Sequence, residues 1–163
     1  MSDIVRLILV ITLLVIGLGA YFLVMNALFS GGIAKTKSMI QSMSARSFGI
    51  GFVNFVFFAV IALVLFSVAE NMGPFIKGVL TIPAVVIVAF LAIVLSLGLA
   101  GMANFIGERI FSDASTWKQT LWGTVCLSLA CALPFVGWFL LFPYVGFVGI
   151  GAVILGFFQR QKI

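Results

Sequence analysis

The sequence contains no histidine, and only 8% of its 163 residues are charged. Without histidine the chain cannot form a Ser-His-Asp triad, an HExxH zinc helix or a histidine-ligated haem site. Soluble domains carry about 25% charged and about 45–50% apolar residues, whereas 64% of this chain is hydrophobic. Because this number of charges cannot cover a protein surface in water, the composition predicts an integral membrane protein.

Acidic residues are scarce too. Asp3, Glu70, Glu108 and Asp113 are the four in the chain, and all lie at the ends of apolar stretches, whereas proton and ion paths use carboxylates inside the membrane. The chain also lacks a phosphate-binding loop, a nucleophile elbow, a dinucleotide fingerprint and a metal-type cysteine spacing. These absences predict a protein with no enzymatic activity of its own, no metal site and no nucleic-acid partner.

Apolar stretches, in contrast, are abundant. Residues 7–29, 48–69 and 78–105 contain no charge, and each is long enough for a helix to cross a hydrocarbon core of about 30 Å. Pro83 is expected in the first turn of the third helix, where its missing N–H costs little. The pattern predicts an all-α polytopic membrane protein.

Two further apolar stretches, residues 119–133 and 138–158, are shorter or contain a proline. Asp113 or Ser115 is expected to cap the first of them, and residues 134–137 form a plausible turn between the two. Pro143 is expected to kink or interrupt the last helix. Two spanning helices, giving about five in total, are favoured over a re-entrant hairpin. We divide the chain into a membrane anchor with a basic loop, residues 1–47, and a four-helix membrane domain, residues 48–163.

The basic residues are distributed unevenly among the connections. If the helices alternate in direction, seven of the nine fall on one side and only Arg6 and Lys77 fall on the other. The positive-inside rule then places the N-terminus outside and the C-terminus in the cytoplasm. The seven on the cytoplasmic side are Lys35, Lys37, Arg46, Arg109, Lys118, Arg160 and Lys162.

The longest polar segment, residues 31–47, allows two interpretations. It can be a basic loop that only fixes the topology, which we favour. Alternatively, its apolar residues share one helical face and it lies on the inner leaflet as an amphipathic piece. In both cases Lys35, Lys37 and Arg46 are the candidate contacts with the lipid surface.

Small residues in the apolar stretches are candidates for close helix packing, within the chain or with a partner. Asn54 and Asn104 are the candidate polar groups within the membrane, where each can hydrogen-bond a neighbouring helix. The small residues form two pairs at a spacing of four and a glycine-rich set in the last stretch: Ala103, Gly107, Ser128, Ala132, Gly146, Gly149, Gly151 and Gly156.

From Ser47 onward the chain resembles the small membrane domain associated with bacterial polymer-forming cytoskeletal (bactofilin-like) proteins. The matching motifs are Thr81-Ile82-Pro83, Gly107-Glu108-Arg109, the run from Leu133 to Trp138, and Gly149-Ile150-Gly151-Ala152. The resemblance implies a four-helix unit of the bacterial inner membrane with an assembly or anchoring role. No β-helical polymer-forming domain accompanies it in this sequence.

Two functions follow as hypotheses. The first is a non-enzymatic structural or accessory subunit of a bacterial membrane complex, packed against other membrane proteins or against itself. The second is a small channel or transporter with a pore near the last two helices, which Pro134 and Pro143 are expected to break. No cofactor is evident, and the sequence leaves open a bound lipid, quinone or carotenoid.

Overall fold

The fold is entirely α-helical, as expected. The computed structural model describes residues 2–133 and 135–158, except for the side chains of residues 2, 3 and 7. No strand occurs in these ranges. The helices, in chain order, are α1 (Ser2–Leu28), α2 (Ser30–Glu70), α3 (Pro74–Ile110), α4 (Thr116–Ala132), the π-helical segment η1 (Val136–Leu141) and α5 (Phe142–Phe158).

Four of the helical segments are long and apolar enough to cross a membrane: Ile4–Leu28, Ser30–Glu70, Pro74–Ile110 and Val136–Phe158. The chain is therefore an all-α polytopic membrane protein. Helix α4 has 17 residues, a length of about 25 Å, which is short for the hydrocarbon core. That α4 and α5 cross the membrane as two separate spans, and not as a re-entrant hairpin, stays a prediction.

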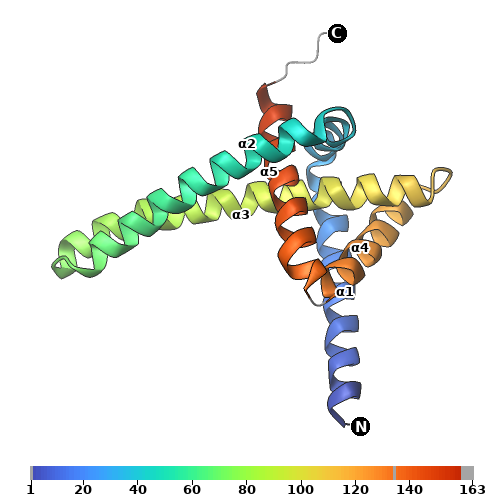
Figure 1. Ribbon diagram of the computed structural model, residues 1–163, viewed down its shortest axis with the longest axis horizontal. Helices are drawn as coiled ribbons and strands as arrows, with labels where there is room; N and C mark the ends of the chain where they lie inside the picture. The colour runs from blue at the N-terminus through green and yellow to red at the C-terminus, as the bar shows by residue number, and fades with distance from the viewer. Residues whose placement is uncertain (1, 134, 159–163) are drawn as a thin grey trace.

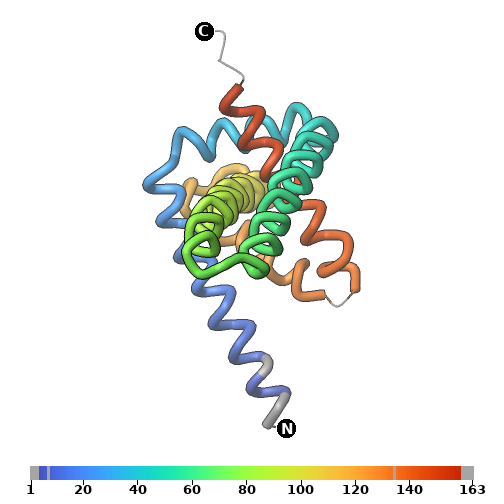
Figure 2. Tube along the Cα trace, turned by 90° about the vertical axis from the view of Figure 1, so that its left-hand side faces the viewer, coloured from blue at the N-terminus to red at the C-terminus, as the bar shows by residue number. Residues whose placement is uncertain are grey.

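The polar segment 31–47 is helical and belongs to α2. Ser30–Glu70 is one helix in which Met43 alone has non-helical backbone angles (φ −143°, ψ 45°). This kink lies in a serine-rich stretch, and the Ser42 hydroxyl donates to the Ser38 carbonyl at 3.0 Å, a bond that competes with regular helix geometry. Figure 2 shows the part of α2 before the kink running from the top of α1 to the base of the α2–α3 hairpin.

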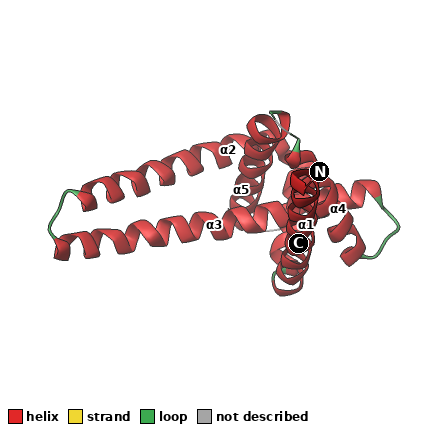
Figure 3. Cartoon of the chain, turned by 90° about the horizontal axis from the view of Figure 1, so that it is seen from below, coloured by secondary structure: helices red, strands yellow, loops and turns green. Residues whose placement is uncertain are grey.

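After the kink, α2 runs antiparallel to α3 and forms a long hairpin. Its outer part, residues 57–70 and 74–91, is called the arm below. Ala62, Ala69 and Ala84 are buried in its seam, and the rings of Phe58 and Phe90 meet edge to face at 6.0 Å between centroids. No other helix of the described chain runs beside the arm (Figures 1 and 3).

The prediction for Pro83 was wrong, because α3 begins at Pro74 and Pro83 lies inside it. The last apolar stretch also differs from the expectation. Helix α4 ends at Ala132, Leu133 lies in a bend and Phe135 in a turn, and helix resumes at Val136; Pro134 lies outside the described residues. Pro143 does not interrupt the helix. The π-helical turns of η1 directly precede it, and a wider helix accommodates a residue that lacks an N–H.

The core lies where α5 crosses α2 and α3. A β-carbon on Gly98 would lie 2.7 Å from the Gly149 Cα, and one on Gly151 would lie 2.8 Å from the Gly51 backbone nitrogen. At both crossings only glycine lets the backbones approach so closely. Next to them, the Phe147 ring of α5 contacts Phe48, Phe52 and Phe55 of α2 at centroid distances of 5.8, 5.2 and 5.5 Å. These phenylalanines pack against α5.

Candidate functional site: a polar junction of four helices

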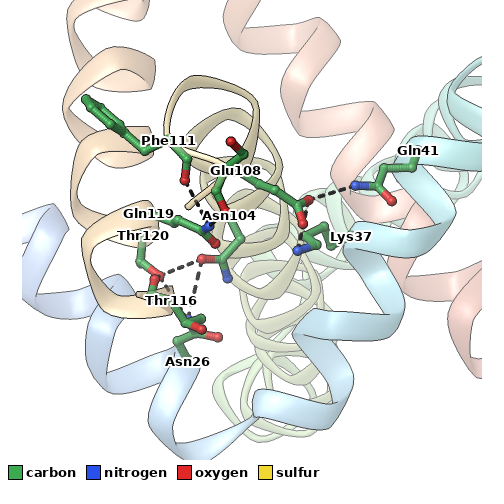
Figure 4. Close-up of polar contacts among 10 residues, drawn as sticks. Asn26, Lys37, Gln41, Asn104, Glu108, Phe111, Thr116, Gln119 and Thr120 are labelled. Carbon is green, nitrogen blue, oxygen red and sulfur yellow. Dashed lines mark hydrogen bonds and ion pairs between the residues drawn. The ribbon is translucent and has the colours of Figure 1, made fainter. Parts of the chain in front are cut away.

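Polar side chains gather where the end of α1, the first part of α2, the end of α3 and the start of α4 meet (Figure 4). The set consists of Asn26, Lys37, Asn104, Glu108 and Thr120, and is called the polar junction below. In a membrane protein such groups must find partners within the protein. The junction is therefore the first place to look for a function.

Three side chains at the junction bond directly across helices. The Asn26 amide nitrogen of α1 donates to the Thr120 hydroxyl of α4 at 2.9 Å and lies 3.4 Å from the Asn104 carbonyl oxygen of α3. The Thr120 hydroxyl can donate its one hydrogen to the Asn104 carbonyl oxygen at 2.5 Å or to the Thr116 carbonyl at 2.9 Å. Asn104 is 6% exposed and Thr120 is fully buried. Each such contact contributes about 0.6–2 kcal/mol within a membrane.

Small residues bring α3 and α4 close enough for this bonding. A β-carbon on Gly123 would lie 2.8 Å from the Gly107 backbone nitrogen, and Ala103 is fully buried beside the same crossing. The Gln119 side chain stabilises the loop between α3 and α4 by donating to the carbonyls of Phe111 and Ser112 at 3.0 and 3.3 Å. Close packing of the α3 and α4 backbones thus holds the Asn104 amide next to the Thr120 hydroxyl.

An ion pair lies next to the buried bonds. The Lys37 ammonium of α2 is 3.0 Å from a Glu108 carboxylate oxygen of α3, with the two side chains 26% and 38% exposed. The Gln41 side-chain nitrogen donates to the same oxygen at 2.9 Å. Since the pair is partly exposed, it contributes about 0.2–1 kcal/mol at most. It fixes the first part of α2 against the end of α3.

A cavity of about 210 Å³ opens between these helices, and its polar lining includes Asn26, Ser30, Lys37, Asn104, Thr116 and Gln119. This volume is far above the roughly 10–15 Å³ that one water needs, so the cavity has room for several waters. Its amides, hydroxyls and single ammonium suit a small polar group. No three histidine, cysteine, aspartate or glutamate side chains cluster as a metal site in the described part of the chain.

The structure uses the small residues unequally. Gly149 and Gly151 lie at the crossings of α5, and Ala103 and Gly107 lie against α4. A β-carbon on Gly146 or Gly156 would meet side-chain or backbone atoms only at 3.4 Å or more. Ser128 is half-buried and Ala132 is exposed, so this pair forms no seam within the chain.

The polar candidates also differ in whether they contact another helix. Asn104 bonds across helices, whereas the Asn54 amide donates to the Ile50 carbonyl of its own helix at 2.8 Å. Lys37 is paired with Glu108, and Lys35 and Arg46 are exposed. Arg160 and Lys162 lie outside the described residues. The first part of α2 turns Ile33 and Ile40 into the core, so its apolar face packs on protein. The division at residue 47 stays a prediction.

Sequence reasoning did not single out Asn26, Thr120, Gly51, Gly98 or Gly123 as site residues. A weak signal exists for Gly98, because small residues continue one turn before Ala103. No such signal joins Asn26 to Thr120, which lie 94 positions apart.

Comparisons with protein families, with curated proteins and with solved structures find no match to this chain. The class stands on the helices alone: an all-α polytopic membrane protein with a crossed glycine-rich core.

Proposed function

We propose that the protein is a non-enzymatic accessory or structural subunit of a membrane complex, and that its arm is the surface that packs against partner membrane proteins or a second copy. The observation that carries this proposal is the uneven burial of the helices. In the most apolar windows of α1, α2 and α3 only 12%, 11% and 17% of the residues are buried, against 44% in the last segment. Three long helices are left for other molecules to cover.

The arm offers the broadest of these uncovered surfaces, because two helices lie side by side along it (Figure 1). Valine, isoleucine, leucine and phenylalanine side chains are exposed on both helices, including Phe57, Val60, Leu63, Val64, Ile82, Val85, Val86 and Phe90. Association within lipid is driven by van der Waals packing of helix surfaces and by hydrogen bonds between helices, because lipid tails are as apolar as these side chains. The resemblance to membrane domains beside polymer-forming proteins, with its implied assembly role, agrees with this proposal.

The placement in the membrane is part of the proposal. The arm runs across α1 and α5 (Figures 1 and 3), so these helices cannot all follow one bilayer normal. With the arm as the spanning hairpin, Glu70 and Lys77 reach one surface, and Lys37, Glu108 and Lys118 reach the other. The positive-inside rule assigns the second surface to the cytoplasm of a bacterial inner membrane, and we place the C-terminus on that side.

A reporter that is active only in the cytoplasm, fused after Ile163, tests this orientation. We expect full activity there and none from the same reporter inserted at the arm tip, after Met72. The reverse pattern would contradict the orientation and leave the accessory role to be judged separately.

The function itself is tested by purifying the intact chain from its native membrane in a mild detergent and measuring the mass of the particle. We expect a homo-oligomer or a complex with a membrane protein in a fixed ratio. A monodisperse monomer without any partner would refute the proposal.

A small transporter is the second candidate, and the polar cavity of about 210 Å³ beside Lys37 favours it. The cavity lies between α1, α2, α3 and α4, and Pro134 and Pro143 do not line it. Reconstituted vesicles would then take up a small polar solute faster than empty vesicles, and Asn104→Leu would abolish the difference. Equal flux in both kinds of vesicle would count against this candidate.

A further inference from the structure

A second cavity lies against the opposite face of the first part of α2. Its volume is about 370 Å³, and apolar side chains from α3, α5 and the α1–α2 connection line it: Phe29, Ile93, Leu97, Val153 and Phe157. This volume is in the range of about 300–1,000 Å³ typical of small-molecule sites. The lining continues along α3 from Leu97 to Ile93, away from the charged end of that helix.

The charged lining residue of this groove is Lys35. The ion pair found within residues 2–133 and 135–158 joins Lys37 to Glu108, so Lys35 has no carboxylate partner there. The neighbouring Thr36 hydroxyl donates to the Gly32 carbonyl at 2.9 Å. The groove thus combines one uncompensated ammonium with an apolar floor.

The groove is open next to the start of α2, where a β-carbon on Gly32 would meet nothing within 4 Å. A lipid headgroup can therefore approach Lys35 from this side.

We propose that this groove binds an anionic phospholipid, with the headgroup phosphate at Lys35 and one acyl chain against Leu97, Ile93 and Val153. A free phosphate would use the charge and leave the apolar floor uncovered. A zwitterionic lipid such as phosphatidylcholine carries the same phosphate, but its own ammonium group offsets that charge next to Lys35. The site does not depend on the accessory role, because it involves α2, α3 and α5 outside the arm.

Native mass spectrometry of the intact chain in detergent, with phosphatidylglycerol or phosphatidylcholine added, tests this proposal. We expect phosphatidylglycerol to bind about fivefold more tightly, the usual effect of one basic residue on an anionic lipid. Lys35→Gln should reduce this preference to about one. The matched control Lys118→Gln removes a charge from the exposed first turn of α4 and should keep it.

A second variant tests the apolar floor. A β-carbon on Gly156 would lie 3.6 Å from the Lys35 Cβ, an ordinary contact, so Gly156→Phe can enter the groove while Lys35 remains. It should lower the occupancy of both lipids at least tenfold, with an unchanged unfolding midpoint. A millimolar excess of inorganic phosphate should not displace phosphatidylglycerol. An unchanged preference in Lys35→Gln, unchanged occupancy in Gly156→Phe, or displacement by phosphate would each overturn the proposal.

Discussion

Two glycines on opposite faces of α2, the exposed Gly49 and the buried Gly51, allow a sharp test of the crossed core. A β-carbon at Gly51 would lie 2.7 Å from the Gly151 nitrogen and 2.8 Å from the Phe147 carbonyl carbon, whereas one at Gly49 would meet nothing within 4 Å. Ordinary non-bonded carbon contacts are about 3.5–4.0 Å. Gly51→Ala must therefore push α2 and α5 apart by about 1 Å, and Gly49→Ala need move nothing.

The free energies of unfolding should change in opposite directions. Alanine gains about 0.5–1 kcal/mol over glycine inside a helix at either position. At Gly51 the forced separation costs about 1–3 kcal/mol or more, and it also loosens the contacts of Phe147 with Phe52 and Phe55. We expect Gly51→Ala to be less stable than Gly49→Ala by about 2–3 kcal/mol.

Thermal unfolding of the intact chain in detergent, followed by tryptophan fluorescence, measures this difference. At about 2–4 °C per kcal/mol for a chain of this size, Gly51→Ala should unfold at least about 4 °C below Gly49→Ala. Equal midpoints, or a higher one for Gly51→Ala, would refute the backbone contact between α2 and α5.

The remaining predictions concern single polar side chains and use the same measurement. Asn104→Ala should destabilise the protein by about 1–2 kcal/mol, because Asn26 and Thr120 lose a buried hydrogen-bond partner. Asn54→Ala removes a bond within one helix and should change the free energy of unfolding by less than about 0.5 kcal/mol. Equal losses in the two variants would contradict the hydrogen bonds of the polar junction. Ser47→Ala should be neutral or stabilising, since the fully buried Ser47 hydroxyl has no hydrogen-bond partner; a loss above about 1 kcal/mol would show that this hydroxyl is bonded.

The membrane class and the approximate positions of the long helices could be predicted from the sequence, because length and the absence of charge decide whether a helix suits a bilayer. The polar segment 31–47 was harder. Its lysines and serines are typical of a loop, yet Ile33 and Ile40 are 1% and 3% exposed in the core. Burial of one face against the other helices stabilises this segment as a helix. Intrinsic propensities and local periodicity do not include that tertiary contribution.

The candidate site was only partly predictable. The spacing of Ala103 and Gly107 indicates a close helix contact, and the structure supplies Gly123 on α4 as the opposing residue. The sequence alone marks Asn104 as a candidate for a contact between helices, because polar groups within a membrane need partners. Its partners Asn26 and Thr120 depend on how distant helices cross, and no local pattern contains that information.

The central claim is that the arm packs against another membrane protein. Site-specific photo-cross-linking in the native membrane, from a photoreactive residue in place of Val60 or Val86, tests it most directly, since these side chains are 51% and 60% exposed on the two helices of the arm. We predict one discrete protein adduct, of a second copy or a partner, from both positions and none from Lys118. Adducts with lipid alone at both arm positions would contradict the account.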